Sequence, residues 1–214
     1  MKIFSQIISW LFLPLFMPVY ALLLVMFVPS NQDFFFNEDC FYTMILQNKI
    51  VILSRFILFC VITPGLSYLL LVRYKIISSV HMETSRERNI PIIIMLVYCL
   101  LLYFMFVREG DLVSLPKFVY SLPLSGVFVT ATFFFLNRWK KVSIHAGGGG
   151  ILVGFILAYI LLHAQYELWI LAVAIVVSGM IMTARLFLGK HTMDELLIGW
   201  GTATFLTFAV NYLY

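Results

Sequence analysis

Residues 146–163 read AGGGGILVGFILAYILLH, an apolar stretch without a Lys, Arg, Asp or Glu side chain. An uninterrupted apolar run of about 18 residues or more is typical of a transmembrane helix. Six further runs of this kind can be marked, at residues 5–28, 49–72, 91–107, 118–136, 167–184 and 195–213. The sequence therefore predicts an all-α, polytopic transmembrane bundle. Pro14 and Pro18 in the first run predict a kink or a re-entrant segment, so the expected number of spans is six or seven.

The composition agrees with a membrane-embedded chain. Of 214 residues, 63% are hydrophobic and 11% are charged, whereas about a quarter of the residues in soluble domains are charged. We expect one integral membrane domain, residues 1–214. Cys40, Cys60 and Cys99 are far apart and form no CxxC pair, which indicates packing residues, with no metal site and no cofactor. The net charge of +4 is spread over short loops, which predicts no nucleic-acid partner.

The hydrophilic segments sort onto two faces of the membrane. Residues 73–90, 137–145 and 185–194 are separated from one another by two crossings, so they must share a face. Basic residues gather there: Lys2, Arg73, Lys75, Arg86, Arg88, Arg138, Lys140, Lys141, Arg185 and Lys190, against Lys49, Arg108 and Lys117 on the other face. The positive-inside rule places the basic face in the cytoplasm, unless some of these cations are there to bind an anion.

Two short patterns on the basic face can carry chemistry. The first is Ser143-Ile144-His145-Ala146, and the second is Arg185-x5-His191-x3-Glu195. If a helix begins near His191, Glu195 lies one turn further along, where it can accept a hydrogen bond from one ring nitrogen and leave the other free as a nucleophile. The Arg185 guanidinium can bind an oxyanion, and helix N-terminal amides at residues 146–148 would add donors to it.

These patterns resemble two motifs of the type 2 phosphatidic acid phosphatase superfamily, which also includes bacterial acid phosphatases and vanadium haloperoxidases. The family motifs are Pro-Ser-Gly-His and Ser-Arg-x5-His-x3-Asp. This chain has Val142-Ser143-Ile144-His145 and Ala184-Arg185-x5-His191-x3-Glu195, with Gly199 downstream as in the family. A third motif, Lys-x6-Arg-Pro, has a loose counterpart in residues 86–91, which read RERNIP. The resemblance covers residues 75–205, a phosphatase-like core. The chain lacks the Pro and Gly of the first motif, the Ser of the second and the Lys of the third. It also has Glu195 where the family has aspartate.

The resemblance implies a metal-independent phosphatase that acts on a lipid phosphate monoester or diphosphate from the bilayer. His191 would attack phosphorus and form a phosphohistidine, His145 would protonate the leaving oxygen, and Glu195 would orient His191. The phosphate-binding group would be Arg185, Ser143, Arg88 and Arg86. Phosphatidate, phosphatidylglycerol phosphate, polyprenyl diphosphate and lipid A phosphates all fit as substrates. The resemblance also implies a bacterial inner membrane and an active site on the periplasmic face, against the charge count; it says nothing of the oligomeric state.

Each candidate residue also has a structural interpretation. Residues 192–195, TMDE, form a capping box that explains Glu195 without catalysis. Arg185 can anchor a helix end at the interface, and His145 can tether one. The four glycines at 147–150 lack the lysine of a P-loop and favour close helix packing.

Other functions remain open from the sequence. The chain could be a non-catalytic phosphatase-like protein that binds a lipid headgroup, or a small transporter or scaffold. Haem binding by His145 and His191 lacks an attachment motif. His81 is expected to be solvated or interfacial, and His163 to lie on the opposite membrane face. Arg55, inside the second span, is expected to pair with a carboxylate or to snorkel.

Overall fold

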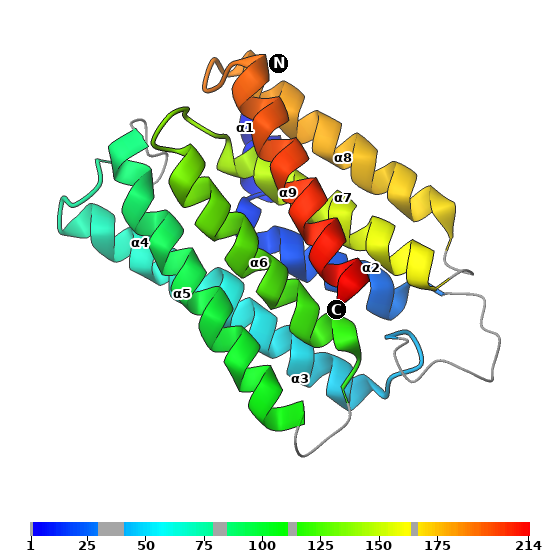
Figure 1. Ribbon diagram of the computed structural model, residues 1–214. Helices are drawn as coiled ribbons and strands as arrows, with labels where there is room; N and C mark the ends of the chain where they lie inside the picture. Colours follow the sequence, from blue (N-terminus) through cyan, green and yellow to red (C-terminus); the bar gives the residue numbers. More distant parts are fainter. Residues whose placement is uncertain (1, 30–40, 79–84, 111–114, 164–166) are drawn as a thin grey trace.

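Seven helical stretches of the structure are long and apolar enough to cross a membrane (Figure 1). In this computed structural model, the described residues are 2–29, 41–78, 85–110, 115–163 and 167–214, and among them the fold contains helices and no strand. The elements are α1 (Lys2–Leu11), η1 (Pro14–Phe16), α2 (Met17–Phe27), α3 (Leu46–Phe56), η2 (Ile57–Ile62), α4 (Thr63–Arg73), α5 (Ser85–Gly110), α6 (Lys117–Leu136), α7 (Ile144–Leu162), α8 (Leu168–Phe187) and α9 (Met193–Leu213). The predicted all-α membrane bundle is confirmed, with seven spans.

Helix α7 is the core of the bundle. In its most apolar part 72% of the residues are buried, against 28% to 39% in the other six spans. Its glycines let α9 approach closely: a Cβ added at Gly150 would lie 2.5 Å from the carbonyl oxygen of Trp200, and one at Gly154 would lie 2.4 Å from that of Thr204. The glycine run therefore serves helix packing, as small residues do in membrane interfaces.

The first span is broken in the middle, as its prolines predict. Helix α1 ends at Leu11, and a 3₁₀ turn begins at Pro14 before α2 continues across the bilayer. The hydroxyl of Tyr20 donates to the carbonyl oxygen of Leu11 at 2.9 Å, which satisfies an acceptor that the break releases. Such a break is stable at membrane depth only where protein groups replace the missing helix bonds.

The second span has an irregularity that the sequence analysis did not predict. Between α3 and α4, η2 is a π-helix of six residues. Pro64 has no N–H to give to a carbonyl one turn earlier, and just before it both the backbone N–H and the hydroxyl of Thr63 donate to the carbonyl oxygen of Leu58. The wide turn therefore accommodates the proline inside a continuous span.

The predicted start of the third span is wrong. Helix α5 begins at Ser85, well before the start predicted at residue 91, so Pro91 lies in its second turn. The polar residues that suggested a loop have partners in the neighbouring connection: Arg88 Nη1 donates to the carbonyl oxygen of Val142 at 2.8 Å, and Asn137 donates to Asn89 at 2.9 Å. Hydropathy alone excludes such residues from a span, whereas these contacts keep them helical.

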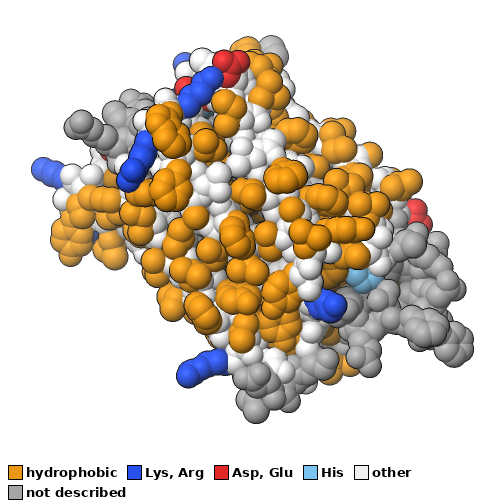
Figure 2. Space-filling view, viewed as in Figure 1, with side chains coloured by type: hydrophobic (Ala, Val, Ile, Leu, Met, Phe, Trp, Pro, Cys, Tyr) orange, Lys and Arg blue, Asp and Glu red, His pale blue; other side chains and the backbone are white. Residues whose placement is uncertain are grey.

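Charged side chains lie mainly toward the two ends of the bundle, and apolar side chains cover much of the surface between them (Figure 2). Arg55 pairs with Glu109 and lies over the ring of Phe106, so the pairing alternative for Arg55 is the correct one. Cys60 and Cys99 are buried free thiols, as expected. Cys40 lies outside the described residues.

Candidate functional site

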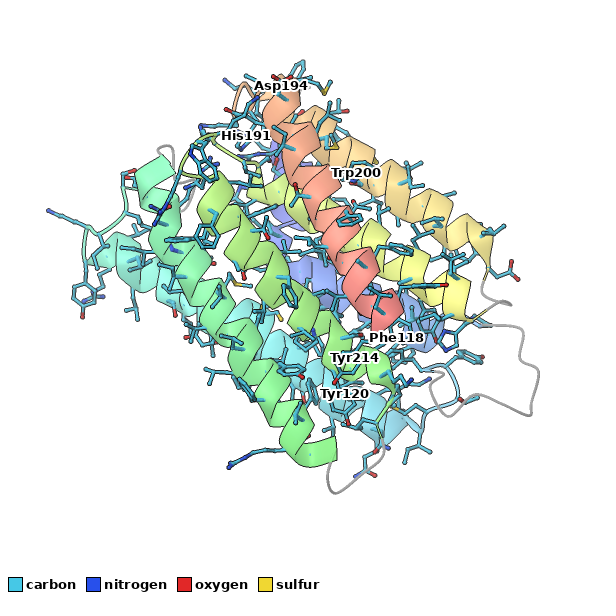
Figure 3. All side chains as sticks on the ribbon, in the orientation of Figure 1. Phe118, Tyr120, His191, Asp194, Trp200 and Tyr214 are labelled. Carbon is cyan, nitrogen blue, oxygen red and sulfur yellow. The ribbon has the colours of Figure 1, made fainter. Side chains whose placement is uncertain are left out.

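The described parts of segments 73–90, 137–145 and 185–194 meet at one end of the bundle, where α5, α7 and α9 begin and α8 ends. Besides the contact between Arg88 and Val142, Lys140 pairs with Asp194 at 3.1 Å, and the backbone N–H of Ser143 donates to the carbonyl oxygen of Glu195 at 3.2 Å. Figure 3 shows His191 and Asp194 at this end, with Tyr120 and Tyr214 at the other. For the described parts of the three segments, the expected meeting on one face is confirmed.

Four of the predicted site residues line a single cavity of about 330 Å³. They are Arg88 at the start of α5, His145 in the first turn of α7, Arg185 in the last turn of α8, and His191 just before α9. Three of them lie on helices and His191 lies in the connection before α9, so the fold brings cationic and imidazole groups from separate segments to one cavity. The rest of the lining is predominantly apolar.

Glu195 holds His191 in a defined orientation. Its Oε2 atom lies 2.7 Å from Nδ1 of His191 and accepts from the backbone N–H of Thr192 at 3.3 Å. The hydroxyl of Thr192 in turn accepts from the N–H of Glu195, which completes the capping box. Capping and orienting therefore share one carboxylate and do not exclude each other. A carboxylate acceptor at Nδ1 puts the proton there and leaves the lone pair on Nε2.

The surroundings of His191 keep its imidazole neutral. Burial lowers the pKa of His191 from 6.5 to about 4; the hydrogen bond that His191 donates to Glu195 opposes this shift, and the positive charges of Arg88 and Arg185 add to it. A neutral imidazole is the form that has a free lone pair at Nε2. The lowered pKa therefore favours the neutral form of His191 in the neutral pH range.

Two buried guanidinium groups make one part of the cavity wall positive. Arg88 and Arg185 are each only 4% exposed and lie close enough to repel each other. Nε of Arg185 has no hydrogen-bond partner among the described residues. Buried charges and donors without partners are costly. An oxyanion between the two arginines would supply both the missing acceptor and the compensating charge.

The remaining predicted residues take different places. Ser143 is fully buried and caps α7, where its hydroxyl accepts from the N–H of Ala146 at 3.3 Å, and its carbonyl oxygen accepts from Gly147. The expectation that these two amides are donors for an anion is therefore wrong, because the helix already uses them. The side chain of Arg86 and the whole of His81 lie outside the described residues. His163 stacks on Tyr159 beyond the other end of α7, as expected.

The apolar part of the cavity was not predicted from the sequence. Its walls include residues of both irregular segments and their neighbours: Leu13, Pro14, Phe56, Cys60 and Tyr68. Pro14 and Pro64 were the available signal, because non-helical backbone at membrane depth commonly lines a cavity.

The site can bind an oxyanion and present an oriented imidazole to it. No group of three or more His, Cys, Asp or Glu side chains in the described ranges is arranged to hold a metal ion. Comparison of the chain with protein-family models, with curated proteins and with solved structures finds no match in any of the three.

Proposed function

We propose that the protein is a membrane phosphatase that hydrolyses a phosphate monoester or diphosphate of a lipid through a phosphohistidine intermediate. One observation carries the proposal: two buried arginines and two histidines line a cavity whose remaining wall is predominantly apolar. A phosphate with a hydrocarbon tail matches both parts. The type 2 phosphatidic acid phosphatase resemblance of the two motifs supports the same chemistry.

The proposed first step is attack by Nε2 of His191 on phosphorus. The phosphorus–nitrogen bond forms as the bond to the leaving oxygen breaks, and the protonated imidazole of His145 gives its proton to that oxygen. Arg88 and Arg185 bind the non-bridging oxygens, where fixed positive charge stabilises the transition state most. Glu195 stabilises the positive charge that develops on His191.

In the second step water cleaves the phosphohistidine. His145, now neutral, takes a proton from the water as its oxygen attacks phosphorus, and the electron pair of the phosphorus–nitrogen bond returns to Nε2 of His191. Free phosphate leaves and both histidines regain their starting protonation. A metal ion is not required by this scheme, because the two guanidinium groups supply the positive charge.

The departure from the family at Glu195 is compatible with this role. Glutamate is one methylene longer than aspartate, yet Oε2 still reaches Nδ1 of His191 at 2.7 Å. The longer side chain also lets the same atom cap the helix at Thr192.

Phosphate release from purified protein in lipid nanodiscs tests the proposal. His191→Ala should abolish release from lipid phosphates, and His145→Ala should slow substrates with poor leaving groups more than those with good ones. His163→Ala is the matched control, because it removes a buried histidine at the opposite end of α7. Full turnover in His191→Ala would refute the enzyme. Headgroup binding without turnover in the wild type would favour the non-catalytic alternative.

We further infer that the membrane is a bacterial inner membrane and that the site faces the periplasm. Removing the candidate anion-binding cations from the charge count weakens the positive-inside argument, and the family resemblance implies the periplasmic leaflet. Trp139, 79% exposed between α6 and α7, gives a test in a background without the native cysteines. Trp139→Cys should react with an impermeant maleimide in intact cells, while exposed Lys117→Cys at the other end should be protected. The reverse pattern would place the site in the cytoplasm.

A further inference from the structure

The cavity extends from the phosphate site into the middle of the bundle and out to its lipid-facing side. Besides the arginines and histidines, its wall includes Phe56 and Leu122, which are at most 2% exposed. The same wall includes Trp10 on α1 and Leu69 on α4, whose exposed fractions are 55% and 59%. The cavity thus reaches the bundle surface beside the first and second spans.

Both irregular spans contribute to this part of the wall. Leu13 and Pro14 belong to the break in the first span, and Cys60 belongs to η2 in the second. Broken helices and π-helical turns in membrane proteins are found where a cavity or a functional site needs them. Two such departures on one cavity indicate that its shape is built in and is not a packing gap.

The size of the cavity limits what can fill it. An apolar cavity of about 150 Å³ holds one benzene molecule, so the 330 Å³ of this cavity corresponds to roughly a dozen carbon atoms by the same scale. The same volume includes the space beside Arg88 and Arg185, so the apolar part has room for at most one hydrocarbon chain of moderate length.

We propose that this cavity binds a single hydrocarbon chain, which enters from the bilayer between α1 and α4 while the phosphate lies between Arg88 and Arg185. The preferred substrates are then lipid phosphates with one chain, such as monoacyl or prenyl phosphates, over diacyl ones. The placement of the headgroup rests on the proposed function. The chain site itself rests on the cavity.

Gly65 allows the channel to be blocked without disturbing its wall. It lines the cavity, and a Cβ added there would meet no atom within 4 Å. Gly65→Phe should therefore place a ring in the channel. Gly179→Phe is the matched control: this helical glycine also has open space at its Cβ, is exposed on α8, and is not among the residues that line the cavity.

The experiment measures the dissociation constants of methyl-, hexyl- and dodecylphosphonate for the protein in nanodiscs. Each buried methylene contributes a several-fold gain in affinity, so wild type and Gly179→Phe should bind the dodecyl compound much more tightly than the methyl one. Gly65→Phe should bind dodecylphosphonate at least about tenfold more weakly than Gly179→Phe, with methylphosphonate unchanged. Each ligand also partitions into the nanodisc lipid, but this affects both variants equally. The ratio of their dissociation constants for one ligand is therefore independent of the partition.

Equal affinities of Gly65→Phe and Gly179→Phe for every chain length would overturn the channel. Gly65→Leu is a second, smaller substitution that keeps the test valid if the phenylalanine variant misfolds. If Gly65→Leu weakens the binding of all three ligands equally, the channel is also overturned. Faster release of phosphate from a diacyl phosphate than from its monoacyl counterpart would overturn the proposed preference. Chain-dependent binding without any phosphate release by the wild type would instead refute the hydrolase and leave the chain site standing.

Discussion

At the scale of single residues, the environment of His191 was partly readable from the sequence. The spacing from His191 to Glu195 predicted their contact, and the TMDE pattern predicted the capping box, but the two interpretations competed for one carboxylate. The structure shows that a single oxygen, Oε2 of Glu195, serves both. The low pKa of His191 was not predictable, because it depends on burial and on the packing of Arg88, a distant residue, beside Arg185 and His191.

Glu195→Gln separates orientation from capping. The amide keeps much of the capping geometry but loses the charge that stabilises a positive imidazole, so activity should fall by up to about 10⁴-fold, as when the orienting carboxylate of a Ser-His-Asp triad becomes an amide. The melting temperature should change little. Thr192→Val is the control: it removes the capping hydroxyl, should cost about 1 kcal/mol of stability, and should retain activity per folded molecule. The opposite pattern would mean that Glu195 only caps α9.

The pKa of His191 predicts a pH dependence of stability. Since this pKa is 6.5 in the unfolded chain and about 4 in the fold, the unfolded state binds more protons between these values, and stability must fall as the pH decreases from 6.5 to 4. The loss attributable to His191 should be at most roughly 3 kcal/mol. Thermal unfolding of wild type and His191→Gln across this range measures it. A difference between the two proteins that does not vary with pH would contradict the buried neutral imidazole.

At the scale of helices, seven apolar runs predicted six or seven spans, and Pro14 and Pro18 predicted a kink or a re-entrant segment in the first; the structure has seven spans, with a break in the first. The limits of α5 and the π-helix were not predictable from local sequence. Ser85–Ile90 is polar and reads as a loop, and only its contacts with Val142 and Asn137 explain why it is helical. A proline such as Pro64 is compatible with a kink, a π-turn or a helix start, so its outcome depends on the packing around it.

The close approach of α7 and α9 can be tested at Gly154. Gly154→Ala would put a methyl group 2.4 Å from the carbonyl oxygen of Thr204, which must force the helices apart at a cost of about 1–3 kcal/mol. Gly201→Ala, on α9 with open space at its Cβ, should leave stability unchanged or raise it by up to about 1 kcal/mol through helix propensity. Thermal unfolding in the same detergent compares them. Equal melting temperatures would show that small residues do not limit this interface.

At the scale of the whole molecule, the topology gathers the site. An even number of crossings separates the three basic segments, so the sequence alone predicted that they share a face. It could not predict which side chains turn inward: Arg88 and Arg185 are buried beside the cavity, whereas Lys140 pairs with Asp194 at the surface. The apolar cavity depends on contacts among five spans, which no local pattern encodes.

Trapping the covalent intermediate tests the central claim most directly. Purified protein in nanodiscs is mixed with a ³²P-labelled lipid phosphate. It is then denatured rapidly without acid, because phosphohistidine is labile in acid, and separated from the lipid. The account predicts label on the wild type at His191, an equal or larger amount on His145→Ala if the second step is slowed more than the first, and none on His191→Ala. Label that persists on His191→Ala, or phosphate release by His191→Ala at the wild-type rate, would contradict it.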